Sequence, residues 1–125
     1  MSLNQTHRIN LSRMWQVVCI DGARCEPTRF DLNASLTKMP TTIERQFNKP
    51  TNLGESKVTL VLENFPSLAM FQLNESELQN DSTTAKCFRS EATTLLQRIN
   101  TIRVNLPAIE TWPEGMRARL EITAD

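Results

Sequence analysis

Several residue types are scarce in this sequence, and each scarcity excludes a class of site. The 125 residues contain no tyrosine, one histidine and three glycines. His7, ahead of the first expected strand, is the only histidine, so a serine or cysteine nucleophile has no base and zinc has no ligand cluster. Three scattered glycines cannot form a phosphate-binding loop. We therefore expect no catalytic residue, no bound metal and no cofactor.

Neither sign of charge is in excess, and long apolar runs are absent. The chain has 14 basic and 14 acidic side chains, and its pI is about 6.6. Because a nucleic-acid-binding surface usually needs a basic face, we expect no nucleic-acid partner. No run approaches the roughly 20 apolar residues of a membrane span. The first residues carry no secretory signal, which favours a cytoplasmic location.

Cysteine is also scarce and occurs in an odd number. Cys19, Cys25 and Cys87 fit a disulfide framework poorly, and Cys19 and Cys25 are too far apart for a CxxC redox pair. We interpret all three as buried or incidental thiols.

The length suits one domain, because two halves would each be too small for a core of their own. We assign residues 8–125 to a single domain and residues 1–7 to an N-terminal tail. Its first three residues, Met-Ser-Leu, are also typical of residues added during cloning.

Alternation of polar and apolar residues predicts strands through most of the chain. Val58, Leu60 and Leu62 share one face of the clearest strand. Residues 90–96 are expected to form one helical turn with Ser90 as its N-cap. Seven to nine short strands with frequent turns indicate an antiparallel β-sandwich. The strands are expected at 8–20, 29–32, 42–47, 57–63, 68–73, from 78, at 100–106 and at 116–122.

The charged residues of these strands show no catalytic arrangement. Glycoside hydrolysis requires two carboxylates on opposite sides of a bond. Each available glutamate is expected to lie singly on the solvated surface, and four arginines are expected along one sheet face. The glutamates are Glu44, Glu63, Glu110, Glu114 and Glu121, and the arginines are Arg45, Arg103, Arg117 and Arg119.

Carbohydrate recognition commonly uses flat aromatic side chains, which are few here. Trp15 lies in an apolar segment and is expected in the core. Trp112, in a polar turn beside Pro113, is the one aromatic candidate for a ligand contact, with packing of its own loop as the alternative.

Six segments, in order, resemble the sugar-binding domain of family 2 glycoside hydrolases. VTLVLENF (58–65) and AMFQLN (69–74), followed by Leu78, are similar to the family's "LxFEGV" and "A.VWVNG" block. The resemblance extends over residues 8–123 and implies a jelly-roll, galactose-binding-like sandwich. The other similar segments are Ile9 to Trp15, Ile43 to Pro50, Phe88 to Val104 and Ala118 to Ile122.

The chain departs from the family pattern at two places. Glu75 replaces the glycine of the "NG" turn, and because glycine most easily takes positive φ, we expect a different turn type there. Arg89-Ser90-Glu91 replaces the family's aspartate segment. In the family the catalytic carboxylates lie on a separate barrel domain, so the resemblance implies a fold and a ligand class without hydrolysis.

The sequence therefore predicts a non-enzymatic binding or accessory module with a carbohydrate ligand. The alternative is a sandwich that has lost sugar binding and contacts another protein or itself. An enzyme is the least favoured of the three.

Overall fold

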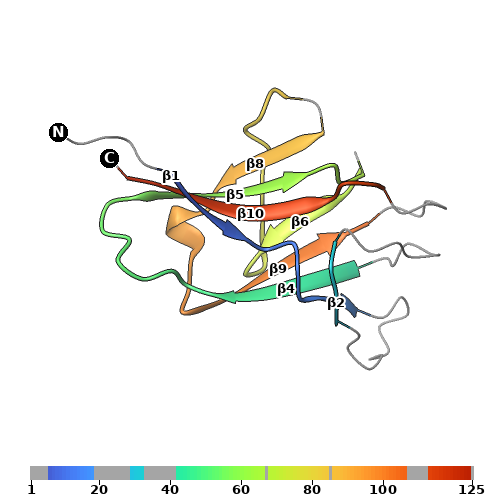
Figure 1. Cartoon of the computed structure of the whole chain (residues 1–125), viewed down its shortest axis with the longest axis horizontal. Coiled ribbons are helices and arrows are strands. Elements are labelled where there is room, and N and C mark those ends of the chain that lie inside the picture. The colour runs from blue at the N-terminus through green and yellow to red at the C-terminus, as the bar shows by residue number, and fades with distance from the viewer. Residues whose placement is uncertain are drawn as a thin grey trace.

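The chain forms two antiparallel β-sheets that pack against each other (Figure 1). The computed structural model describes residues 6–18, 29–32, 42–66, 68–84, 86–106 and 113–124. The four-stranded sheet contains, in spatial order, β1 (Thr6–Asn10), β10 (Arg117–Thr123), β5 (Lys57–Glu63) and β8 (Cys87–Glu91). The six-stranded sheet contains, in spatial order, β3 (Arg29–Phe30), β2 (Trp15–Val18), β4 (Thr42–Asn48), β9 (Ile99–Asn105), β6 (Met70–Leu73) and β7 (Ser76–Glu77).

This arrangement confirms the predicted all-β antiparallel sandwich. The long strands β5 and β9 lie inside their sheets, with a neighbour on each side. A single 3-10 turn, η1 (Thr93–Leu95), is the one helix of the described residues. No helix of the described ranges has the length and apolar character needed to cross a membrane.

The core fills the space between the two inner faces. Alternate residues of β5 and β9 point inward, as their sequence pattern predicts, and are fully buried. Trp15 is 0% exposed, which confirms its expected place in the core. Its ring lies 6.3 Å from Phe65, which in turn makes an edge contact with Phe71 at 5.4 Å. These rings join β2 to the β5–β6 connection and to β6 itself.

The expected continuous strand at 8–20 is wrong, because the chain changes sheets there. β1 belongs to the four-stranded sheet and β2 to the six-stranded sheet. Between them Leu11 is buried and Met14 has a φ of 67°. The indole Nε1 of Trp15 donates to the Leu11 carbonyl at 2.6 Å, which holds this crossing closed.

The expected helical turn is shorter than predicted, and Ser90 does not cap it. Ser90 lies in β8, is buried and pairs with Leu60 of β5. Pairing with β5 satisfies this backbone, so the strand continues to Glu91 and η1 starts only at Thr93. Ala92 precedes η1 and makes no side-chain cap.

Several predicted features lie outside the described residues. They are Cys19, Cys25, Glu110, Trp112 and the turn at 21–22. Cys87 is half-buried with a free thiol. His7, expected ahead of the first strand, instead lies in β1, where it is exposed and pairs with Ile122.

Candidate functional site

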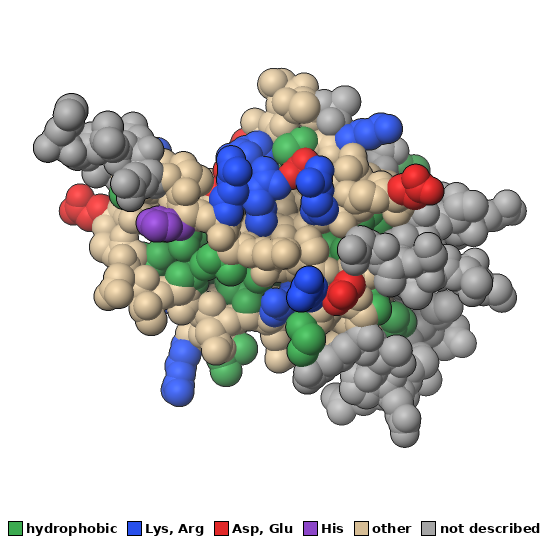
Figure 2. All heavy atoms as spheres, in the orientation of Figure 1, with side chains coloured by type: hydrophobic (Ala, Val, Ile, Leu, Met, Phe, Trp, Pro, Cys, Tyr) green, Lys and Arg blue, Asp and Glu red, His purple; other side chains and the backbone are tan. Residues whose placement is uncertain are grey.

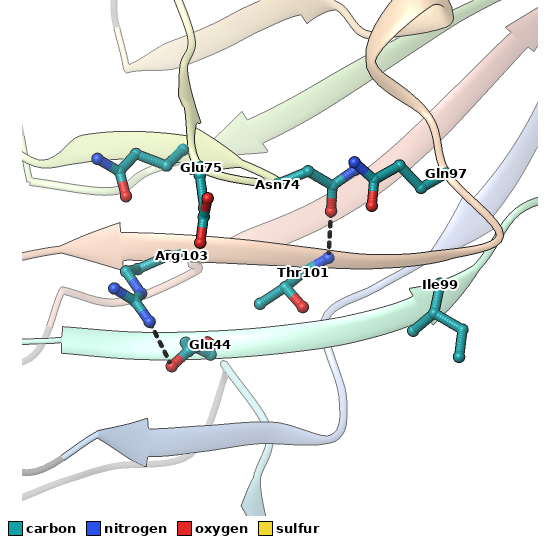
Figure 3. A pocket seen from close by; sticks show the side chains of 8 residues that line it. Glu44, Asn74, Glu75, Gln97, Ile99, Thr101 and Arg103 are labelled. Carbon is teal, nitrogen blue, oxygen red and sulfur yellow. Dashed lines mark hydrogen bonds and ion pairs between the residues drawn. The ribbon is translucent and has the colours of Figure 1, made fainter.

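A polar hollow of about 370 Å³ lies on the outer face of the six-stranded sheet (Figure 3). Pockets of this size fall at the small end of the range that binds ligands. Its walls come from β4, β9, the β6–β7 hairpin and the segment after η1. The lining side chains are Glu44, Gln72, Asn74, Glu75, Gln97, Ile99, Thr101 and Arg103.

Strand register places five polar residues in one row across this face. Glu44 of β4 pairs with Arg103 of β9, and Arg103 pairs with Gln72 of β6. The row continues to Gln16 of β2 and Glu77 of β7. Residues directly opposite each other in antiparallel strands share a face, so all five point outward. Arg103 Nη2 contacts Glu44 Oε1 at 3.3 Å, an ion pair visible in Figure 3.

A network of amide hydrogen bonds, centred on the buried Asn100, supports one wall of the hollow. Asn74 Nδ2 donates to the Leu95 carbonyl at 2.9 Å and to Asn100 Oδ1 at 2.8 Å, while Asn74 Oδ1 accepts from the Thr101 amide at 2.9 Å. Asn100 is 0% exposed and binds both the amide and the carbonyl of Gln97, at 2.8 and 2.9 Å. Asn74 and Asn100 thus hold the β6–β7 hairpin against the start of β9.

The turn of the β6–β7 hairpin has positive φ at both of its central residues, where the glutamate in the sequence predicted a different turn type. Asn74 and Glu75 have φ values of 51° and 71°. Positive φ at both central residues is the type I′ pattern, which matches the twist of a hairpin. The expectation that loss of glycine changes the turn is therefore wrong, and Glu75 adopts the left-handed conformation itself. A residue with a Cβ pays roughly 1–2 kcal/mol for that conformation.

Replacing Glu75 by glycine is therefore expected to stabilise the fold. We expect Glu75→Gly to raise the free energy of unfolding by about 1 kcal/mol, because glycine takes positive φ without steric cost. Urea denaturation followed by circular dichroism measures the change. Glu75→Ala, which keeps a Cβ, should give no comparable gain, and equal stability of the glycine and alanine variants would contradict the explanation.

A second polar feature is an ion network on the outer face of the four-stranded sheet. Figure 2 shows basic side chains gathered around acidic ones over β5, β8 and β10. Glu121 accepts from Arg89 at 2.6 Å and from Arg119 Nε at 2.8 Å, with Arg8 at 3.8 Å. Arg119 also binds Glu63. Glu121 is only 7% exposed, so it is not the solitary surface residue that the sequence predicted.

The network lowers the pKa of both carboxyls. For Glu63 the main cause is the hydrogen bond from Arg119, which holds its pKa below the ordinary 4.5. Burial alone would raise the pKa of Glu121, but hydrogen bonds from Arg89 and Arg119 outweigh burial and lower it. The same contacts raise the pKa of Arg119 against its own burial. The lowered pKa values of the two carboxyls and the raised pKa of Arg119 indicate that these charged groups stabilise one another.

The free energy of unfolding should therefore decrease at acidic pH. Carboxyls with lowered pKa values stabilise the folded state fully above the unfolded pKa of 4.5, and this contribution is lost as the pH falls through the folded values. Urea unfolding at a series of pH values should show a steep decline beginning near pH 4.5. Glu121→Gln should cost about 2 kcal/mol at neutral pH and flatten the decline. Glu91→Gln, an exposed change on the same sheet, should do neither.

The four arginines expected along one sheet face are in fact divided. Arg103 lies on the outer face of the six-stranded sheet, whereas Arg117 and Arg119 belong to β10 of the other sheet. Arg45 shares a face with Ile102 and donates to the Arg13 carbonyl at 2.6 Å. Burial lowers the pKa of Arg45. The alternating strand charges alone could not reveal this division, since it depends on which strand joins which sheet.

The sequence singled out few residues of the hollow. Glu44 and Arg103 were expected as solvated charges, and Gln72, Gln97 and Thr101 were not considered. The signal for Gln72 and Thr101 is the polar side of the alternation in β6 and β9, which is also typical of any exposed sheet face, and Gln97 lies before β9, outside any strand. Glu114 is exposed, as expected. The described residues contain no group of three or more histidine, cysteine or acidic side chains placed to hold a metal.

Comparison with known proteins finds likeness in structure only. No protein-family model matches the chain, and no curated protein sequence matches it. A beta-glucuronidase from an uncultured Clostridium species aligns with a TM-score of 0.64 and 14% identity, over 98% of this chain and 29% of that one. The Bifidobacterium dentium beta-glucuronidase complexed with coumarin-3-O-glucuronide aligns at 0.62 and 11%, over 98% and 31%.

The chain thus spans about three-tenths of the length of these enzymes. At such low identity the likeness concerns the fold. The structural match is to a domain of family 2 glycoside hydrolases, the same enzyme family as the resemblance in sequence. The chain has the antiparallel β-sandwich fold of a domain found in these family 2 glycoside hydrolases.

Proposed function

We propose that the chain is a non-enzymatic carbohydrate-binding or accessory module, and that the polar hollow is its ligand site. The supporting observation is the chemistry of the lining: amides, a hydroxyl, carboxylates and a guanidinium converge from β4, β9, the β6–β7 hairpin and the segment after η1. Planar amide and carboxyl groups hydrogen-bond sugar hydroxyls, which both donate and accept. The side chains of Gln72 and Gln97 form no hydrogen bond within the described residues, so their amides can serve a ligand.

The arrangement favours binding over hydrolysis. Hydrolysis needs one carboxyl as acid and a second as nucleophile or base. In the hollow the Glu44 carboxylate is engaged by Arg103, which leaves Glu75 as the carboxylate without an ion pair. The beta-glucuronidases extend well beyond the part that matches this chain. We expect no release of p-nitrophenol from a panel of p-nitrophenyl glycosides, glucuronides included.

Isothermal titration against a panel of neutral, amino and uronic oligosaccharides tests the proposal. Saturable binding that weakens about fivefold in Gln72→Ala supports it, since one lost hydrogen bond to a ligand is worth about 1 kcal/mol. Glu91→Gln on the opposite sheet is the control and should bind normally. Trp112→Ala belongs in the same series, because the sequence offers that indole as a ligand contact.

The alternative function makes a different prediction in the same samples. If the sandwich has lost sugar binding and contacts itself, no sugar of the panel binds and sedimentation shows a concentration-dependent dimer. A monomer that binds no member of the panel contradicts both carbohydrate binding and self-association.

A further inference from the structure

The side chain of Glu75 forms no polar contact with the described residues that would account for a glutamate at this position of the turn. The carboxylate is exposed and forms no hydrogen bond or ion pair with the described residues. Its backbone φ of 71° is costly for a residue with a Cβ. Asn74, its neighbour in the turn, is fully explained by three hydrogen bonds. A strained residue that contributes no contact to the fold, at the wall of a hollow, points to a role outside the fold.

The charges of the hollow indicate what Glu75 would meet. Three ionisable side chains line it, namely Glu44, Glu75 and Arg103. Glu44 and Arg103 form an ion pair at 3.3 Å, so their charges largely cancel. The remaining charge is that of Glu75, and the lining has a formal net charge of −1. Figure 3 shows its carboxylate directed into the region between the β6–β7 hairpin and Arg103.

A net negative hollow discriminates among sugars by charge. A uronic acid would bring a third carboxylate into a hollow whose one guanidinium, Arg103, is already shared with Glu44. A protonated amine would instead donate charge-assisted hydrogen bonds to Glu75, and these are roughly twice as strong as neutral ones. The remaining lining groups, Gln72, Gln97 and Thr101, are neutral and suit hydroxyls.

We infer that the hollow selects amino sugars with a free, protonated amine, and that Glu75 is the residue that recognises this amine. This inference rests on the proposed carbohydrate-binding function and names its ligand class. The ligand class is therefore cationic, although the structurally similar enzymes are named for glucuronides.

Three oligosaccharides of equal length provide the test. They are a β-1,4-linked glucosamine tetramer, its fully N-acetylated counterpart, and a tetramer containing glucuronate. Titration at about pH 6 keeps an amine protonated when its pKa is near that of an α-amino group. The wild-type chain should bind the glucosamine tetramer at least tenfold more tightly than the acetylated one, and the glucuronate tetramer weakest. Added salt should weaken the first interaction selectively.

Glu75→Gln separates charge from backbone, because glutamine keeps the Cβ at the same positive φ. It should abolish the preference for the free amine while leaving the weak binding of the acetylated tetramer. Glu91→Gln makes the same charge change on the opposite sheet and should leave the preference intact. Equal binding of all three tetramers, or a preference that survives Glu75→Gln, overturns this inference but not the carbohydrate-binding proposal. Absence of binding by every sugar overturns both.

Discussion

Trp15→Ala is expected to lower the free energy of unfolding by about 4 kcal/mol, the largest effect of any single change described here. Trp15 is 0% exposed and its ring packs at 6.3 Å from Phe65. Truncation removes the apolar burial, leaves a cavity and deprives the Leu11 carbonyl of its indole partner at 2.6 Å. Since single domains are stable by only about 5–15 kcal/mol, the variant should be marginally folded.

Urea denaturation measures this loss. Far-ultraviolet circular dichroism is the probe to use in place of fluorescence, because the substitution removes one of the two tryptophans. Trp15→Phe is the matched variant: it keeps most of the apolar contact and removes the N–H donor, so we expect a smaller loss. A loss below about 1 kcal/mol for the alanine variant would show that Trp15 does not hold the two sheets together at the crossing from β1 to β2.

How far the sequence predicts this fold depends on whether a feature is local. The alternation in β5 and β9 is local, and both strands bury the residues that the pattern indicates. The crossing at Leu11 to Met14 is not local, because a strand that continues and a strand that changes sheets have the same pattern. What decides between them is the burial of Leu11, together with the pairing of β1 with β10 and of β2 with β4, whose partner residues lie at least 24 positions away.

The same distinction applies to the two polar sites. Glu121 looks like a surface glutamate in an alternating strand, and only the register beside Arg8 of β1, with Arg89 on β8, makes it a buried ion. The hollow joins Glu44 to Arg103 across 59 residues of sequence. The sequence pattern shows that its strand residues are polar and exposed. It does not show that they form one hollow, because this depends on the order of β4, β9 and β6 in the sheet.

The turn at Glu75 shows a third kind of limit. Sequence statistics associate positive φ with glycine, so a glutamate predicts another turn. The structure keeps the type I′ backbone because the Asn74 side chain and the backbone pairing to Thr101 fix the hairpin. Tertiary hydrogen bonds therefore outweigh the local preference of one residue, which is why the buried amides beneath the hairpin matter for the site above it.

Asn100→Leu tests that connection and should cost about 3 kcal/mol. Asn100 is 0% exposed, and a leucine of similar volume would leave the Gln97 amide, the Gln97 carbonyl and one Asn74 donor unsatisfied. Because Gln97 and Asn74 line the hollow, sugar binding should fall together with stability although Asn100 itself is not part of the lining.

Urea unfolding, with hydrogen exchange at the Gln97 amide, measures both effects of this change. Asn105→Leu on the outer face of β9 is the matched control: it removes one hydrogen bond from Thr42 at 3.0 Å and should cost under about 1 kcal/mol, with Gln97 exchange unchanged. If Asn100→Leu exchanged slowly at Gln97 and kept its stability, the amide network could not be what fixes the hairpin. Glu75 would then owe its strained position to some other contact, and the geometry of the hollow would have to be explained without Asn74.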